Sequence, residues 1–170
     1  MQSDGFTLIE LIAALSIAAI FIIIAVPGYY SLIQNNKVVS VANQLSASFN
    51  QARMEAVKRG VRVSVCPAGN ASFTACGSNT QWQQGWIVFT DADNNNAIES
   101  TADLVKIAHA LPSGITITTT SNMVSYDGTG FVTSGSASLF LSAAGCSGNN
   151  ARTINIAAGG RLSIVNAACS

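Results

Sequence analysis

The stretch Gly5-Phe6-Thr7-Leu8-Ile9-Glu10 opens an apolar run that continues to Val26, and this run decides the fold of the chain. Glu10 is the single charged residue within it. As a helix, residues 6–26 would span roughly 31 Å, which is enough to cross the hydrocarbon core of a bilayer. A carboxylate inside such a segment is costly unless it meets a cation or reaches the headgroups, so Glu10 is a candidate functional residue.

The five residues before the run, Met1-Gln2-Ser3-Asp4-Gly5, contain no lysine or arginine. A secretory signal peptide starts with a basic region and has a shorter apolar core, so the leader fits that class poorly. The segment resembles the class III signal of type IV prepilins, in which a short polar leader ending in Gly precedes Phe-Thr-Leu-Ile-Glu and an apolar helix. Asp4 is a departure from the family pattern, because it stands where a basic residue would help to set orientation in the membrane.

This resemblance implies a processing site and an assembly contact. A prepilin peptidase would cleave between Gly5 and Phe6, and the new amino terminus on Phe6 would be N-methylated. In a filament, the Glu10 carboxylate would meet the Phe6 ammonium of a neighbouring subunit and so select one stagger between packed helices. A plain membrane anchor, with Glu10 reaching into the headgroups, is the alternative.

The amphipathic pattern after the apolar run predicts that the helix continues. Apolar residues recur at helical spacing, at Val38, Val41, Ala42, Leu45, Phe49, Ala52 and Ala56. Lys58 and Arg59 lie in the last turn, where cations favour the helix dipole, and Gly60 is a typical C-terminal stop. We expect one helix over 6–60, with 6–26 in the membrane or filament core and the rest packed on a globular domain.

Pro27-Gly28 divides the two halves of this helix. Proline removes a backbone hydrogen bond and crowds the preceding turn, so the pair is expected to bend or loosen the helix. Pro27 also matches a proline that the pilin family commonly carries about one membrane span into the mature chain.

Beyond Gly60 apolar and polar residues alternate with a period of two, and this alternation predicts strands throughout 61–170. The candidate strands, separated by clusters of Asn, Gly and Ser, are 61–65, 86–90, 104–108, 115–119, 138–141, 153–156 and 162–165. No second helix is expected. The predicted fold class is therefore α+β: residues 1–5 are a leader, and a long N-terminal helix, transmembrane in its first half and amphipathic in its second, packs on an antiparallel β-rich C-terminal domain.

All four cysteines, Cys66, Cys76, Cys146 and Cys169, follow the membrane segment. An even number in an exported domain predicts two disulfides, and Cys66–Cys76 and Cys146–Cys169 are favoured because each closes a local loop. A metal site is the alternative, but no Cys-x-x-Cys pair or nearby histidine supports it. We expect neither a metal nor a cofactor.

The second half of the chain is similar to the GspH/FimT group of pilin-like proteins. The residues that carry this resemblance are Asn50–Gly60, Cys66-Pro67, Gly85–Asp91 and Gly160-Arg161. The group contains minor type IV pilins and the H-type minor pseudopilin of type II secretion. In its FimT branch, a DNA receptor for natural transformation, a late Gly-Arg-x-Arg motif contributes to DNA binding. Here Ser163 replaces the second arginine.

Eight basic and eight acidic residues give a net charge of zero, so the chain as a whole does not attract nucleic acid. The resemblance to the FimT branch nevertheless implies Arg161, together with Arg152, as candidate DNA-binding residues, and both lie in a stretch with no acidic residue after Asp127. A further basic cluster is formed by Arg53, Lys58, Arg59 and Arg62. The alternative for these cations is a solvated rim, or a contact with the acidic patch of a neighbouring subunit.

The segment Asp91–Asn96, together with Glu99, alternates oxygen-bearing side chains as calcium ligands do, but it lacks the glycine and the distal glutamate spacing of an EF-hand loop. A polar hairpin tip between the strands at 86–90 and 104–108 is favoured instead. Its acidic patch would comprise Asp91, Asp93, Glu99 and Asp103.

No catalytic constellation is readable, so we expect a substrate of the peptidase and the methylase and not an enzyme. The resemblance implies a minor pilin-like structural subunit of a type IV pilus, assembled through its N-terminal helix, in initiation or at the tip. The alternatives are the H-type minor pseudopilin and a DNA-binding pilin. The implied location is the bacterial inner membrane, crossed once with the C-terminal domain in the periplasm, and then a filament of pilins or pseudopilins.

Overall fold

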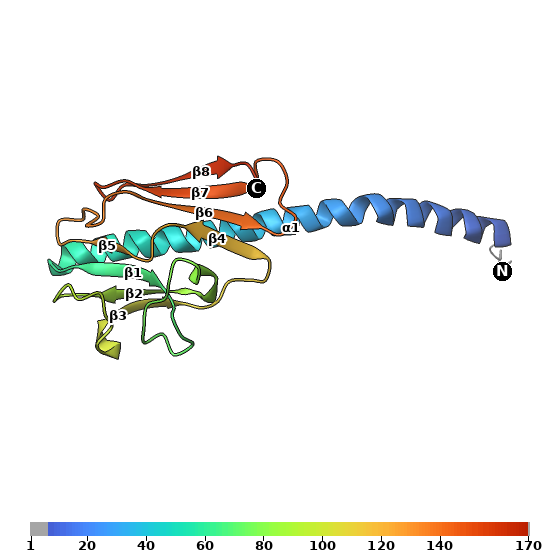
Figure 1. Cartoon of the computed structure of the whole chain (residues 1–170). Helices are drawn as coiled ribbons and strands as arrows, with labels where there is room; N and C mark the ends of the chain where they lie inside the picture. The colour runs from blue at the N-terminus through green and yellow to red at the C-terminus, as the bar shows by residue number, and fades with distance from the viewer. Residues whose placement is uncertain (1–6, 170) are drawn as a thin grey trace, which may run out of the picture. The chain divides into compact units, whose positions relative to one another are not determined.

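The computed structural model describes residues 7–169, within which it contains one long helix and eight strands (Figure 1). Helix α1 spans Leu8–Arg59. The chain divides into two compact units, one ending at Ile33 and the other beginning at Gln34, and α1 contributes to both. The predicted start of the helix at Phe6 lies outside the described residues, and its end falls one residue before the predicted Gly60.

The first unit is the apolar part of α1. Helix α1 is long and apolar enough to cross a membrane, and its most apolar stretch is not buried within the described chain. Large apolar side chains are more than half exposed from Leu8 to Ile23. An apolar surface of this extent needs lipid or other helices as its neighbours.

In the second unit, two antiparallel sheets pack with the second half of α1. The first sheet, in the order β3-β2-β1-β5, is formed by Leu104–Ala108, Trp86–Thr90, Val63–Pro67 and Val124–Tyr126. The second, in the order β4-β6-β7-β8, is formed by Ile115–Thr119, Ala137–Ala143, Ala151–Ile156 and Leu162–Ala167. Two single 3-10 turns are η1 (Trp82–Gln84) and η2 (Thr101–Asp103). This architecture confirms the predicted α+β class.

The main core lies between α1 and the inner faces of both sheets. All seven residues of the predicted apolar stripe on α1 are at most 1% exposed, namely Val38, Val41, Ala42, Leu45, Phe49, Ala52 and Ala56. They share one cluster with Val65 and Val88 of the first sheet and with Leu139 and Ile154 of the second. The stripe therefore fixes the rotation of α1 against both sheets.

The first sheet is also covered on its other face. Cys66, Ile87 and Phe89 form a small second core there, against which Phe73 and Met123 from the loops pack. A disulfide between Cys66 and Cys76 joins the end of β1 to the loop that follows it. A second disulfide links Cys146 to Cys169, so the two bonds are those favoured from the spacing of the cysteines.

The strands differ from the predicted ones mainly at their ends. Strand β1 begins at Val63 and not at residue 61, and β6, β7 and β8 extend beyond their predicted bounds. Strand β5 was not predicted, because its three residues are too few to show a period, although all three are buried.

A buried hydrogen bond ties α1 to β2, since Trp86 Nε1 donates to Ser48 Oγ at 2.9 Å. Ser48→Ala is expected to lower the free energy of unfolding by about 1–3 kcal/mol, because the indole N–H would be left buried without an acceptor. Urea denaturation followed by tryptophan fluorescence measures the change. In the control Ser40→Ala, on an exposed position of the same helix, a change of less than about 0.5 kcal/mol is expected.

Candidate functional site

The first turn of α1 holds Glu10 by reciprocal hydrogen bonds with Thr7. The Glu10 carboxylate accepts from the Thr7 amide at 2.9 Å and from the Thr7 hydroxyl at 2.7 Å, and the Glu10 amide donates to Thr7 Oγ1 at 3.4 Å. This is a capping box, which satisfies backbone donors at the start of the helix. Glu10 is exposed, so its carboxylate can accept a donor from another chain.

Three sequence-predicted features of this unit remain predictions. Gly5 and Phe6, the expected cleavage and N-methylation positions, lie outside the described residues. The contact between Glu10 and the Phe6 ammonium of a neighbour belongs to an assembly. Helix α1 continues as one helix through Pro27 and Gly28. This continuity does not test whether the helix bends there, so the bend stays a prediction.

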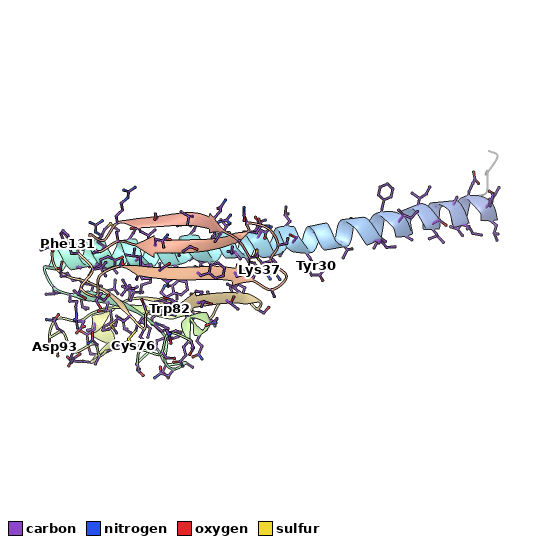
Figure 2. All side chains as sticks on the ribbon, turned by 45° about the horizontal axis from the view of Figure 1, so that its top comes forward. Tyr30, Lys37, Cys76, Trp82, Asp93 and Phe131 are labelled. Atoms are coloured by element: carbon purple, nitrogen blue, oxygen red, sulfur yellow. A yellow bond between two sulfur atoms is a disulfide. The ribbon has the colours of Figure 1, made fainter. Side chains whose placement is uncertain are left out.

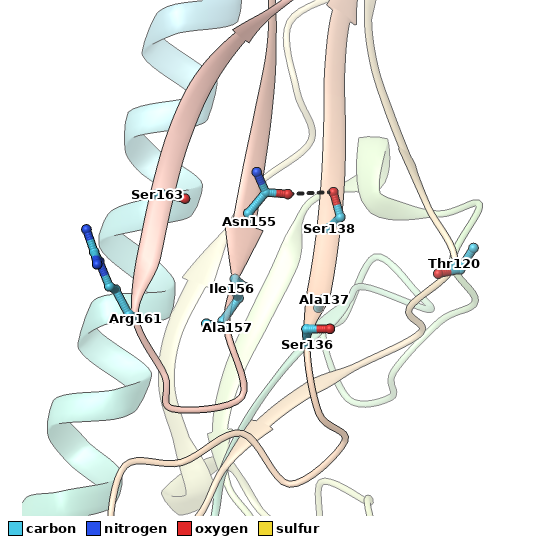
Figure 3. A pocket seen from close by; sticks show the side chains of 9 residues that line it. All are labelled: Thr120, Ser136, Ala137, Ser138, Asn155, Ile156, Ala157, Arg161 and Ser163. Carbon is cyan, nitrogen blue, oxygen red and sulfur yellow. Dashed lines mark hydrogen bonds between the residues drawn. The ribbon is translucent and has the colours of Figure 1, made fainter.

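The outer face of the second sheet, which is turned away from α1, carries mostly small polar side chains, together with Phe140 and Arg161. Its exposed residues include Thr116, Thr118, Ser138, Asn155, Ser163 and Val165. A groove of about 630 Å³ at one end of this face is lined by Thr120, Ser136, Ser138, Asn155, Arg161 and Ser163 (Figure 3). Ser138 Oγ donates to Asn155 Oδ1 at 3.0 Å across the groove. Hydroxyls, an amide and one guanidinium can bind a polar surface, but they offer no general base.

The two candidate DNA-binding arginines do not lie together. Arg161 lines the groove, whereas the strand register places Arg152 at the opposite end of β7. Arg152 shares a face with the buried Ile154, and Arg161 shares the other face with Ser163, because side chains alternate along strands. The Arg152 guanidinium also donates to the Ala151 carbonyl at 2.9 Å. The groove therefore carries one cation, and phosphate attraction scales with the number of cations.

The predicted basic cluster is divided among separate contacts. Arg53 Nε and Nη2 donate to the carbonyls of Gly130 and Gly159, each at 3.1 Å, and so fasten α1 to two loops. The cluster's other members pair with acidic residues: Arg59 and Lys58 with Glu55, and Arg62 with Asp91.

These ion pairs differ in burial: those of Glu55 lie on the surface, and that of Asp91 is buried. The Arg59 guanidinium donates to Glu55 at 2.7 Å, and this hydrogen bond is the main reason that the pKa of Glu55 lies below its ordinary value. The pair of Arg62 and Asp91 is largely buried, with side chains 15% and 0% exposed.

Strands β2 and β3 form the favoured hairpin. Its acidic residues are not one patch, because Asp91 is buried against Arg62. The side-chain amide of Asn95 (Nδ2) donates to the carboxylates of both Asp93 and Glu99, at 2.6 and 2.9 Å. Over residues 7–169, no group of three or more His, Cys, Asp or Glu side chains is placed to hold a metal ion.

A tight loop after β5 presents Phe131, which is 57% exposed. The Asp127 carboxylate accepts from the Thr129 hydroxyl at 2.5 Å, from the Thr129 amide at 2.8 Å and from the Phe131 amide at 3.1 Å. These bonds, led by that of the Thr129 hydroxyl, lower the pKa of Asp127. The sequence interpretation missed this loop, although Asp127-Gly128-Thr129-Gly130 is a turn signal that could have revealed it.

The Asp127 loop is expected to loosen in acid. Because its folded pKa lies below the unfolded one, the carboxylate contributes fully above the unfolded pKa, and this contribution is lost as pH falls through the folded pKa. NMR shifts of the Thr129 and Phe131 amides, followed from about pH 5 to about pH 2, should report the change. Asp127→Asn should abolish this dependence and Asp93→Asn should preserve it; the same titration in Asp127→Asn would contradict the assignment.

Comparison with known families supplies the context for these features. The family model described as Type II transport protein GspH matches residues 41–160, and the prokaryotic N-terminal methylation motif matches residues 1–26. Together they confirm the resemblance inferred from the sequence. No curated protein matches the chain significantly.

Solved structures show the same fold. Two crystal structures of the type IV minor pilin FimU from Pseudomonas aeruginosa (strain PAO1), in space groups P21 and P65, are 16% identical to this chain with TM-scores of 0.60 and 0.56. The alignments cover 76% and 74% of this chain, and 89% and 90% of the FimU chains. The chain, with its N-methylation motif and GspH domain, belongs to the GspH family of pilin-like structural, non-enzymatic subunits.

Proposed function

We propose that this chain is a minor pilin-like structural subunit of a type IV pilus. A prepilin peptidase removes residues 1–5, and Phe6 is N-methylated. Residues 6–26 hold the chain in the bacterial inner membrane, with the domain at 61–170 in the periplasm. The chain then enters the filament through α1, in initiation or at the tip, beside other pilins.

The observation that carries this proposal is that one chain combines an uncovered apolar helix with a domain that has its own buried core. The apolar part of α1 has no cover within the described chain, while the second unit buries a complete core. A subunit that exchanges lipid for the helices of its neighbours accounts for both. The groove on the outer face of the second sheet offers hydroxyls but no general base among its lining residues to activate them, and this fits contact with other proteins better than catalysis.

The H-type minor pseudopilin of type II secretion is the second candidate, and the description of the matching family model supports it. The fold shared with FimU, a type IV minor pilin, supports the pilus instead. Both candidates use the same helix, so the two are separated by the system that depends on the chain.

The deciding experiment deletes the gene in its own bacterium and restores it with the full-length chain. Surface pili are counted by electron microscopy, and secreted proteins are compared in culture supernatants. We expect loss and restoration of pili with unchanged secretion. Loss of secretion with normal pili would assign the chain to the secretion pseudopilus, and no change in either would refute both.

A further inference from the structure

Strand β8 is an open edge at the outer margin of the second sheet (Figure 1). Its six residues, Leu162-Ser163-Ile164-Val165-Asn166-Ala167, contain no charge and no proline. Ile164 and Val165, which alternate between the two faces of the strand, are 38% and 47% exposed. An exposed uncharged strand of this composition is a template for pairing with another chain.

The register shows which backbone groups of β8 are free. The Ala157 amide donates to the Arg161 carbonyl at 2.9 Å, so these residues form a hydrogen-bonded pair. Such pairs alternate along antiparallel strands, and every second residue from Arg161 onward therefore bonds to β7. The N–H and C=O groups that point away from the sheet belong to Leu162, Ile164 and Asn166.

Each of the other three edge strands has a charge, an irregularity or a further hydrogen bond that hinders pairing with another chain. Strand β3 has Lys106 at its centre and a register shift beside it. Strand β5 is covered, because the Thr133 amide donates to the Ser125 carbonyl at 2.9 Å. Strand β4 contacts η1, and the side-chain amide of Asn79 (Nδ2) donates to the Thr119 carbonyl at 3.0 Å. Within residues 7–169, β8 alone lacks such a device.

Both ends of β8 are nevertheless held firmly. The Cys146–Cys169 disulfide and the bond from the Cys169 amide to the Gly148 carbonyl, at 2.9 Å, fix the end of the strand. At the start of β8, Arg53 binds the Gly159 carbonyl in the β7–β8 turn. Figure 2 draws the described side chains on the ribbon. An exposed strand held in this way is organised for binding before any partner arrives.

We propose that β8 receives an extended edge strand from a different pilin-class subunit, which would pair with the free backbone groups of Ile164 and its neighbours. This inference rests on the proposed assembly with pilins. Main-chain hydrogen bonds would supply affinity, and contacts with Ile164 and Val165 would supply selectivity. Anchoring in one membrane or filament keeps the domains at high effective concentration, so a six-residue pairing suffices.

The direction of β8 argues against pairing with β8 or β3 of a second copy of this chain, and the edges of β4 and β5 already carry the contacts described above. Strand β8 runs opposite to the half of α1 that it covers (Figure 1). Antiparallel pairing of β8 with β8 of another copy would turn their α1 helices in opposite directions, whereas helical symmetry keeps all copies in one polarity. Strand β3, which is parallel to β1 and also runs opposite to α1, would meet β8 as a parallel strand with Lys106 at its centre.

The test uses the full-length chain in its own bacterium, with the photo-reactive residue benzoylphenylalanine at Asn166. Cross-linked peptides are identified by mass spectrometry in an otherwise unchanged chain, in Ile164→Pro and in Ile164→Ala. Proline at this position removes an outward N–H and leaves the bonds to β7 intact, so the edge strand tolerates it. We expect Ile164→Pro to lower the yield about tenfold while Ile164→Ala retains most of it.

Folding and filament entry are scored separately. If Ile164→Pro shifts the urea midpoint relative to Ile164→Ala, Asn166→Pro with the probe at Ile164 replaces it. A cross-link to an edge strand of another pilin or pseudopilin that proline abolishes supports the pairing, even if the chain is absent from sheared pili and the pilus assignment fails. Cross-links to a second copy, to a helix or to a protein without a prepilin signal overturn it, as do equal yields in the proline and alanine variants or no cross-link.

Discussion

Arg62→Ala is expected to destabilise the second unit by about 3–5 kcal/mol, because it leaves a buried carboxylate without its cation. Arg62 Nε donates to Asp91 Oδ2 at 2.8 Å, and a second bond joins Arg62 Nη2 to the same oxygen. Nη2 also donates to Asn96 Oδ1 at 2.9 Å, so one guanidinium fixes both the end of β2 and the loop beyond it. Urea denaturation of the full chain in detergent, followed by tryptophan fluorescence, measures the loss.

The matched control is Arg59→Ala on the surface. Arg59 makes a comparable bond to Glu55 at 2.7 Å, but the two side chains are 46% and 20% exposed, so a loss below about 1 kcal/mol is expected. The double variant Arg62→Ala/Asp91→Ala should lose less than the sum of its single variants, because removing both partners leaves no unpaired charge. Equal losses for Arg62→Ala and Arg59→Ala would show that burial does not strengthen the Arg62–Asp91 contact.

The pairing of Arg62 with Asp91 could not be predicted from the sequence. The sequence suggests that Arg62 belongs to a basic cluster and Asp91 to an acidic patch, because residues close in the chain are grouped together. In the fold they pair across the ends of β1 and β2, whose antiparallel register sets Val63 opposite Thr90. A contact over 29 residues depends on that register, which a pattern of alternating residues does not specify.

Features that depend on the spacing of apolar residues along the chain were predictable. The apolar stripe of α1 and seven of the eight strands follow from spacings of 3.6 and 2, since each element must bury one face. The separation of Arg152 from Arg161 was not predictable in the same way, because it required both the hairpin register and the face of each side chain. The open edge at β8 required the order of strands in the sheet, which the sequence leaves undetermined.

Glu10→Ala is expected to leave membrane insertion intact and to reduce incorporation into filaments at least about tenfold, since removing one partner of an ion pair in an apolar environment leaves the other charge unpaired at a cost above about 1.4 kcal/mol. Insertion is followed by membrane fractionation, and incorporation by immunoblotting of sheared filaments. The reason proposed for the loss is the missing counter-charge for the Phe6 ammonium of the neighbouring subunit. The capping box with Thr7 offers a competing reason, because Glu10→Ala also removes a helix cap.

Two further variants separate the charge from the cap. Thr7→Ala removes the hydroxyl of the capping box and keeps the Glu10 charge, so it should incorporate nearly as well as the unchanged chain. Glu10→Gln keeps an oxygen that can accept from the Thr7 amide but loses the charge, so it should fail as Glu10→Ala does. The reverse result, with Thr7→Ala defective and Glu10→Gln normal, would assign Glu10 to helix capping and remove its role in setting the stagger between subunits.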